Sequence, residues 1–380
     1  MKIKLKQAFD LQMGKTPARN QAENWGGNHR WVSIADIGNA EKYIAKTKEC
    51  ITDAGINASG IKVVPQGTVI MSFKLSIGKT AITAQDMYTN EAIIAFIDKK
   101  IFEIDPNYLY HLCCGTDWTA GTNKAVMGLT LNKATLLEKE ISLPDICQQR
   151  KIAAKLDKID AIIADRQQQL TMIEQAVKSR FIELFGDPVS NSYGLPEATL
   201  SDLGEFGRGV SKHRPRNDIK LLGGKYPLIQ TGDVANAGLY ITSYGNTYSE
   251  LGLRQSKMWD KGTLCITIAA NIAKTAILEF DACFPDSVVG FIANERTNNI
   301  FIHYWFSFFQ EILESQAPES AQKNINLKIL SELKVIVPEK RKQDEFASFV
   351  KLTDKSKLAV QQGLQELETL KKSLMQQYFG

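Results

Sequence analysis

The most regular hydrophobic pattern in the chain is a long apolar stripe that occurs twice. Residues 148–185 contain neither Pro nor Gly, and their apolar positions recur at spacings of three and four, which predicts one amphipathic helix. Residues 342–378 repeat the pattern around Gly363, which costs a helix about 1 kcal/mol without necessarily breaking it. Each helix would be roughly 55 Å long. We expect the stripes to pair as an antiparallel coiled coil through Ile152, Leu156, Ile159, Ile163, Leu170, Ile173 and Val177 in the first helix and Phe346, Val350, Val360, Leu364, Leu367 and Leu374 in the second.

Both helices belong to an internal repeat of the chain. Residues 144–186 and 338–380 align without gaps, with 12 identities in 43 positions, and residues 67–97 and 262–292 align with 10 in 31. A repeat of this length marks a duplicated structural unit. The order is therefore module, helix, module, helix, in a nearly circular arrangement with pseudo-two-fold symmetry.

The two modules have the composition of mixed α/β domains. β-branched, partly alternating patterns predict strands in residues 61–70 and 80–97 of the first module, and in residues 264–277 and 287–292 of the second. The aromatic stretch 299–315 predicts a core helix, in which His303 is a packed residue. The fold class is thus α+β, with two mixed α/β modules joined by two long helices. The expected boundaries are 1–141 for the first module, 142–187 for the central helical spacer, 188–335 for the second module and 336–380 for the C-terminal spacer.

Composition narrows the class of protein only a little. A net charge of +4 and a pI of about 8.5 permit nucleic-acid binding without requiring it. The six cysteines form no Cys-x-x-Cys pair and only four histidines accompany them, so we expect free thiols and no metal site. The sequence has no run of 18 apolar residues and no signal-peptide h-region, so we expect a cytoplasmic protein that does not associate with membranes.

The sequence argues against a catalytic centre in this chain. The segment 73–80 ends like a phosphate-binding loop, but position 73 is Phe where that loop needs Gly, and the repeat has Ala273 in place of Gly78. Asn-Pro-Pro-Tyr-like segments, with which a DNA amino-methyltransferase grips a flipped base, do not occur. No nuclease-like set of carboxylates with a lysine appears, and no Ser/His/Asp set recurs between the halves. We therefore expect no catalytic residues.

The candidate DNA-contacting residues are polar and basic side chains in the loops of the modules, which suit phosphates or base edges. The alternative for each is a solvated surface group, and Lys79 and Lys274 fit either role in a repeated turn. The cluster at residues 212–216 is the strongest candidate. The first module offers Lys15, Thr16, Arg19, Arg30, Ser33, Lys74, Lys79, Asn123 and Lys124. The second module offers Arg208, Ser211, Lys212, His213, Arg214, Arg216, Gln230, Thr231, Asn271, Lys274, Gln322, Lys323 and Asn324.

The duplicated order of these features resembles the specificity subunits of type I restriction–modification systems over essentially the whole chain. The strongest mark is a Pro followed by a Gln and the long helix, present as Pro144 with Gln149 and again as Pro338 with Gln343. The second module departs from the family pattern at Ser211-Lys212, where the first has Thr16-Pro17. The other marks are the Gly-x-Thr-Pro opening at 14–17, the segment 31–37, the strand at 67–72 and the loop at 321–325.

The resemblance implies two target-recognition domains, each reading one half of a bipartite, asymmetric site in double-stranded DNA. The helices would set the spacing and dock two methyltransferase subunits, and two motor-nuclease subunits would join them for restriction. S-adenosylmethionine, ATP and Mg²⁺ would belong to those partners. Faces near Ile162, Met172, Leu352 and Leu370 could bind the methyltransferases or lie in the seam. There are three competing hypotheses. The chain could be a self-sufficient methyltransferase or nuclease, a coiled-coil protein in which the modules have no binding role, or a specificity-like orphan or decoy that acts without a modification system.

Overall fold

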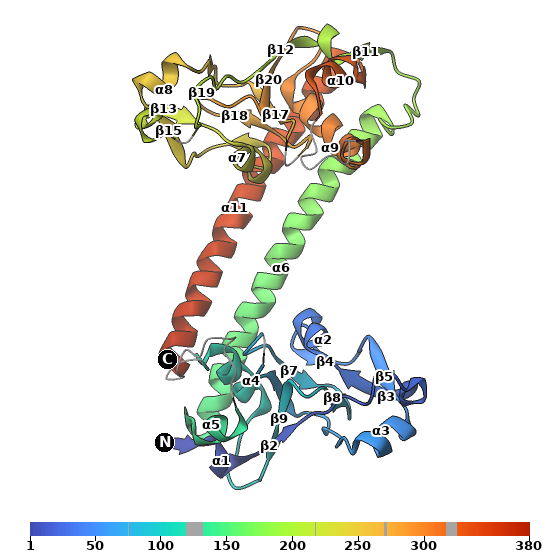
Figure 1. Cartoon of the computed structure of the whole chain (residues 1–380), viewed down its shortest axis with the longest axis vertical. Coiled ribbons are helices and arrows are strands. Elements are labelled where there is room, and N and C mark those ends of the chain that lie inside the picture. Colours follow the sequence, from blue (N-terminus) through green and yellow to red (C-terminus); the bar gives the residue numbers. More distant parts are fainter. Residues whose placement is uncertain (75, 119–131, 217, 270–271, 317–324) are drawn as a thin grey trace. The chain divides into compact units, whose positions relative to one another are not determined.

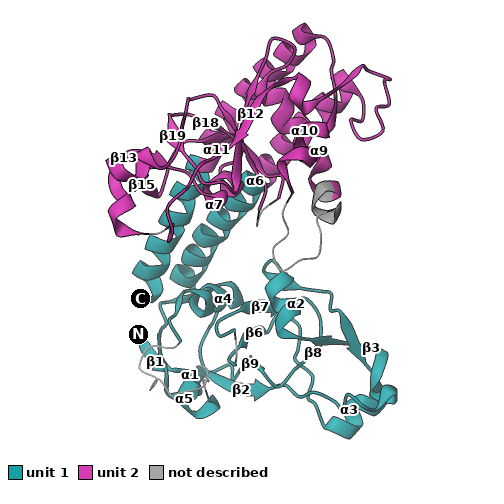
Figure 2. Cartoon of the chain, turned by 45° about the horizontal axis from the view of Figure 1, so that its top comes forward, with its two compact units in different colours: residues 1–167, 362–380 teal, residues 168–361 magenta. Residues whose placement is uncertain are grey.

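The computed structural model describes residues 1–74, 76–118, 132–216, 218–269, 272–316 and 325–380. These residues form two compact units, one of residues 1–167 and 362–380 and the other of residues 168–361 (Figure 2). Each unit combines one module with a segment of each long helix. No helix in the described ranges is both long and apolar enough to cross a membrane, and the six cysteines are free thiols.

The first unit is built on a five-stranded sheet with the order β2-β9-β6-β7-β4 (Figure 1). Neighbouring strands are antiparallel except β4, which runs parallel to β7. A smaller sheet, β5-β3-β8, adjoins it, and β1 pairs with β10. The strands are β1 Lys2–Lys4, β2 Phe9–Met13, β3 Trp25–Val32, β4 Tyr43–Ile44, β5 Glu49–Ile51, β6 Val69–Ser72, β7 Thr80–Thr83, β8 Tyr88–Thr89, β9 Ile93–Asp98 and β10 Glu140–Ser142. The short helices are α1 Leu5–Ala8, η1 Ala22–Asn24, α2 Ile34–Asn39, α3 Asp53–Ser59, α4 Pro106–Gly115 and α5 Lys133–Glu138.

The second unit repeats this plan strand by strand. Its main sheet has the order β12-β20-β17-β18-β14, again with one parallel edge strand, and its smaller sheet begins β15-β13-β19 and gains β16. The strands are β11 Glu197–Thr199, β12 Gly204–Arg208, β13 Leu222–Leu228, β14 Tyr240–Ile241, β15 Asn246–Tyr248, β16 Met258–Trp259, β17 Leu264–Thr267, β18 Thr275–Leu278, β19 Ala282–Cys283, β20 Val288–Ala293 and β21 Lys334–Ile336. The helices are η2 Leu200–Asp202, η3 Ile219–Leu221, α7 Thr231–Asn236, α8 Glu250–Arg254, α9 Asn299–Gln316 and α10 Leu327–Glu332. The predicted duplication of a mixed α/β module is therefore confirmed.

One predicted strand is wrong over most of its length. Of residues 61–70, only Val69 and Ile70 lie in a strand, and Val64 makes an isolated bridge to Met87. Pro65 and Gly67 lie between Val64 and Val69, and Gly67 has a φ of +76°. Proline and a glycine with positive φ form turns rather than strands, so the chain enters the sheet only after this turn.

Both long helices are confirmed. They are α6 Ile146–Phe185 and α11 Lys340–Phe379, and Gly186, with a φ of +75°, follows the end of α6. Helix α11 continues through Gly363, because flanking turns on either side maintain the helix. In the second unit the two helices run antiparallel, since Glu174 pairs with Lys357 at 2.7 Å and Arg180 pairs with Glu345 at 2.6 Å. In the first unit Asp160 pairs with Lys371 at 2.5 Å.

The ends of the apolar stripes extend into the module cores. In the first unit Leu156 of α6 and Leu374 of α11 belong to one buried cluster with sheet and α4 residues. In the second unit the Phe181 ring lies 5.4 Å from that of Phe301 in α9 and 5.3 Å from that of Phe346 in α11. Ile152, Ile159, Val177 and Val350 are buried in the same way. The remaining stripe residues are half-buried: Ile163, Leu170, Ile173, Val360, Leu364 and Leu367.

A buried glutamine fixes the start of each long helix. The Gln149 amide nitrogen donates to the carbonyl oxygens of Glu103 (3.0 Å) and Pro144 (2.9 Å), and its amide oxygen accepts from the backbone N–H of Asp105 at 2.9 Å.

Gln343 makes the matching contacts in the second unit. It donates to Arg296 O (3.0 Å) and Pro338 O (2.8 Å) and accepts from the Thr297 hydroxyl at 2.9 Å. Both glutamine residues are at most 1% exposed. The repeated Pro and Gln of the sequence thus join each helix to the loop that precedes the large helix of its module.

We predict that Gln343→Ala lowers the free energy of unfolding by about 2–3 kcal/mol, because it leaves buried backbone carbonyls without donors. Urea unfolding checks this value. Gln361→Ala, at an exposed position of the same helix, is the control and should change stability by less than about 0.5 kcal/mol. Equal effects of the two substitutions would contradict the role assigned to Gln343.

Candidate nucleic-acid interface

The opening loop of each module begins at a glycine that lies against another backbone segment. The Gly14 amide donates to Ile93 O at 3.2 Å, and the Gly209 amide donates to Val288 O at 2.9 Å. A Cβ atom on Gly14 would lie 2.0 Å from Thr89 O, and one on Gly209 would lie 2.2 Å from Phe284 O. Only glycine fits so close an approach, so both loops leave the sheet at the same place.

The first opening loop brings two of the predicted residues, Lys15 and Thr16, together. The carbonyl of Lys15 accepts from Trp31 Nε1 at 3.0 Å, and its ammonium group donates to Ser59 O at 2.9 Å. The hydroxyl of Thr16 donates to Glu91. Lys15, Thr16 and Glu91 line a hollow of about 600 Å³. The loop is therefore held on both sides while its polar groups face this hollow.

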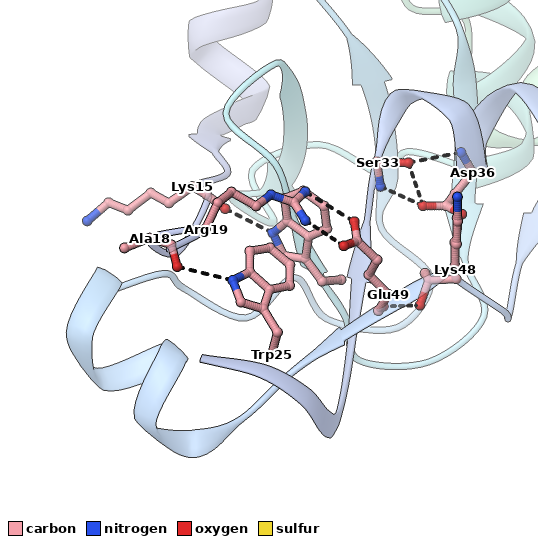
Figure 3. Close-up of polar contacts among 10 residues, drawn as sticks. Lys15, Ala18, Arg19, Trp25, Ser33, Asp36, Lys48 and Glu49 are labelled. Atoms are coloured by element: carbon pink, nitrogen blue, oxygen red, sulfur yellow. Dashed lines mark hydrogen bonds and ion pairs between the residues drawn. The ribbon is translucent and has the colours of Figure 1, made fainter. Parts of the chain in front are cut away.

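Arg19 is the most strongly held of these side chains (Figure 3). Its Nη1 and Nη2 atoms donate to the two carboxylate oxygens of Glu49 at 2.5 and 3.1 Å. Its guanidinium carbon lies 4.0 Å from the ring centroid of Trp25 and 5.0 Å from that of Trp31. The Trp25 indole is itself fixed, because Nε1 donates to Ala18 O at 3.2 Å. Ion pairing and cation–π contact together restrict the guanidinium to one position.

Two further predicted residues of the first module have structural contacts. Arg30 lies in β3 and its Nη1 approaches Cys50 Sγ at 3.6 Å. Ser33 is the N-cap of α2, where its hydroxyl donates to Asp36 at 2.7 Å and accepts from the Asp36 backbone N–H at 3.3 Å. Such a capping box accounts for Ser33 without any DNA contact.

Lys79 and Lys274 lie in a turn that the two units share. The backbone N–H of Lys79 donates to the Ser72 hydroxyl at 3.1 Å, and that of Lys274 donates to the Thr267 hydroxyl at the same distance. The preceding residues, Gly78 and Ala273, both have positive φ, at +89° and +58°. The repeated motif is thus a structural turn.

The side chains near this turn differ between the units. The Lys274 ammonium donates to Gln310 Oε1 at 3.1 Å, and Lys74 lies 5.3 Å from the ring centroid of its neighbour Phe73. Arg208 is exposed at the end of β12. These positions are compatible with either a phosphate contact or a solvated side chain.

The second opening loop has a carboxylate at its centre. Asp286 accepts from Arg216 Nη2 at 2.5 Å and lies 3.7 Å from Arg214 Nη2. Arg214 also donates from Nη1 to Ser211 O at 2.6 Å. His213 Nε2 lies 3.1 Å from Asp218 Oδ2, whereas Lys212 contributes only its backbone N–H to the hydrogen bonds found among the described residues. The basic cluster predicted at 212–216 is thus partly paired within its own module, with Arg214 and Arg216 sharing one carboxylate.

A hollow of about 220 Å³ adjoins this loop and brings four predicted residues together. Ser211, Arg216, Gln230 and Thr231 line it. The Ser211 hydroxyl is buried and has no hydrogen-bond partner in the part of the chain that the structure describes. A buried hydroxyl without a partner is costly, so this group is suited to meet a ligand.

The other predicted residues lie outside the described ranges, and the sequence missed several residues that shape both loops. The undescribed ones are Asn123, Lys124, Asn271, Gln322, Lys323 and Asn324. The missed residues are Trp25, Glu49, Glu91 and Asp286. Glu91 and Asp286 occupy matching positions of the internal repeat, a signal that could have pointed to them.

A family model described as the type I restriction modification DNA specificity domain matches residues 1–175 and again residues 196–369. A type I restriction enzyme specificity subunit of Methanocaldococcus jannaschii, MjaIX, is 26% identical over 274 residues, which cover 67% of this chain and 62% of that protein. The putative MjaX specificity subunit of the same organism is 22% identical over 260 residues, 66% of this chain and 61% of that protein. The chain thus spans about three fifths of the length of these curated relatives.

Solved structures share the fold of the whole chain. A type I restriction–modification S subunit from M. genitalium has a TM-score of 0.59 at 15% identity, covering all of this chain and 96% of that one. A chain from a study of complex assembly and conformational transition in the type I R-M system has a TM-score of 0.60 at 16% identity, covering 100% and 97%. The duplicated arrangement of modules and helices is therefore a known architecture.

Proposed function

The chain belongs to the type I restriction–modification DNA specificity family, and we propose that it is the subunit that reads a bipartite, asymmetric site in double-stranded DNA. Each module reads one half of the site. The helices set the distance between the halves and dock methyltransferase subunits. The chain itself has no catalytic residues and directs the methyltransferase and nuclease activities of its partner subunits to the DNA site.

The observation that carries this proposal is a common scaffold with unlike reading loops. The two units share sheet order, the glycine approach at 14 and 209, and the buried glutamine at 149 and 343. The loops that follow the glycines differ in charge and in the carboxylates that hold them. A duplicated framework with divergent surfaces suits two different ligands of one kind, such as two unlike DNA half-sites.

Exposed apolar residues on the long helices support the docking role. Leu352 is 66% exposed and Met172 is 58% exposed, and Leu370 is also exposed. Large apolar side chains on the surface of a helix are typical of protein interfaces. Ile162 is half-buried, and it remains a candidate for either the seam or the interface.

The remaining partners follow from the same proposal. Two methyltransferase subunits would bring S-adenosylmethionine to the adenines of the site, and two motor-nuclease subunits would bring ATP and Mg²⁺ for restriction. None of these groups is assigned to a residue of this chain. Such a complex would act in the cytoplasm, where host DNA is methylated.

The experiment that tests the function is methylome sequencing of cells that make the cognate methyltransferase, with and without this chain. We expect a bipartite adenine-methylated motif that disappears when the chain is removed. Absence of any chain-dependent methylation beside an active partner would refute the reading role and favour an orphan or decoy. Methylation by the purified chain alone would favour a self-sufficient enzyme.

We predict that Leu352→Glu weakens assembly with the methyltransferase at least tenfold, because it places a charge in an apolar contact. Analytical ultracentrifugation or calorimetry of the two purified subunits measures the change. Gln361→Glu adds the same charge nine residues further along α11, on the opposite face of the helix, and should leave assembly unchanged. Equal affinity of the Leu352→Glu variant and the unaltered chain would exclude this face from the interface.

We also predict that removing one heptad from each helix shortens the gap between the half-sites by about three base pairs, since seven residues span about 10 Å. Deleting 164–170 together with 358–364 leaves the ion pairs Asp160–Lys371 and Glu174–Lys357 on either side. The deletion rotates each helix by only about 20°. Methylome mapping should show unchanged half-sites with a shorter gap, and an unchanged gap would show that the helices do not set the spacing.

A further inference from the structure

Arg19 and Arg216 occupy the same place in the two modules. Arg19 lies three residues before the 3-10 helix η1, and Arg216 lies three residues before η3. Each of these short helices leads directly into the long strand of the smaller sheet, β3 or β13. The two arginines therefore occupy matching backbone positions, and their side chains meet different partners.

Each of these arginines is paired with a carboxylate from a different part of its module. Glu49, in β5, holds Arg19 through both oxygens, whereas Asp286, in the turn before β20, holds Arg216. The two carboxylates do not correspond in the internal repeat. Glu91 occupies the position that matches Asp286, but it accepts from Thr16 and not from Arg19. The two units thus neutralise the equivalent arginine by different means.

The pairing limits what Arg19 can bind. The ion pair has no net charge, so its attraction to a DNA phosphate is largely cancelled. Glu49 occupies one N–H of each terminal nitrogen, and the Nε edge has no partner among the described residues. A guanidinium has five donors in a rigid fork, so this edge retains donors for a neutral acceptor pair.

The position of the fork is also fixed. The Trp25 ring centroid lies 4.0 Å from the guanidinium carbon (Figure 3). The Trp25 and Trp31 rings meet edge to face, with their centroids 5.1 Å apart. The Arg19 side chain is still 53% exposed. The guanidinium of Arg19 is thus neutralised, held in one orientation and still accessible. Such a group is poorly suited to contact a mobile DNA phosphate and well suited to donate to the fixed acceptors of a base edge.

From this geometry, and resting on the function proposed above, we propose that Arg19 is a specificity-determining residue that reads a guanine in the first half-site. Guanine presents O6 and N7 as paired acceptors in the major groove, and arginine is their most frequent partner. Glu49 acts as a positioning residue that orients the guanidinium and suppresses its contact with phosphates. Arg216, with Asp286, occupies the equivalent position in the second module.

The test is methylome mapping of the complete complex containing Arg19→Ala, with Lys46→Ala as control, because Lys46 is an exposed cation of the same module. We expect one guanine position of the first half-site to accept other bases, with discrimination lowered about tenfold or more. The second half-site should be unchanged, and the control should retain the full motif. Uniformly reduced methylation of an unchanged motif would identify a phosphate contact and overturn the proposal, as would no change at all.

A second variant keeps the proposal testable if Arg19→Ala fails to assemble. Glu49→Gln leaves the guanidinium in place but restores its net charge. We expect the complex to keep the guanine preference, to bind non-specific DNA more tightly, and to show a salt dependence steeper by nearly one phosphate contact. An unchanged salt dependence would overturn the role of Glu49. If the unaltered chain directs no methylation, the proposed function itself has failed. If the unaltered chain directs methylation and the Arg19→Ala complex keeps the same motif, only the guanine contact has failed.

Discussion

Neither module completes its core without both long helices, and the rest of the structure depends on this constraint. Leu156 and Leu374 come from different helices and lie in the same buried cluster of the first unit. In the second unit the Phe181 and Phe185 rings pack on Phe301, and the Phe346 ring packs on Phe181. Burying three or four such side chains contributes several kcal/mol. Because each helix supplies core residues to both units, a helix cannot shift without disturbing a module.

The buried glutamines and the opening glycines extend this constraint to the opening loops of the modules. Gln149 and Gln343 join the helix starts to the loops before α4 and α9. Gly14 and Gly209 fix where each opening loop leaves the sheet. Beyond these points the modules diverge. Glu91 and Asp286 occupy matching positions but contact different loop residues, Thr16 and Arg216, and Arg19 pairs instead with Glu49. The framework can therefore stay constant while the opening loops change.

The sequence was a good guide to the framework and a poor one to the site. Helix periodicity and the internal repeat predicted α6, α11 and the paired modules, because a buried face imposes a pattern that survives duplication. The strand predicted at 61–70 was wrong over most of its length, because Pro65 and Gly67 form a turn and only Val69 and Ile70 lie in β6.

Side-chain pairing at the site could not be predicted in the same way. Arg19 appeared as one basic residue among many, since its partner Glu49 is distant in sequence and occurs in a strand of no unusual composition. The apolar stripe was predicted as a helix seam, but nothing in its spacing indicated that Phe181 or Leu156 also enters a module core. Contacts of this kind depend on tertiary structure, which periodicity does not contain.

We propose that the two modules are independent readers on one duplicated framework. The most direct test replaces residues 1–141 with a second copy of residues 196–335 and maps the methylation that the resulting complex directs. We predict an inverted repeat of the second half-site with the original spacing, because both ends would then carry the same reader. A motif that retains the first half-site, or an assembled and active complex with no bipartite motif, would contradict it.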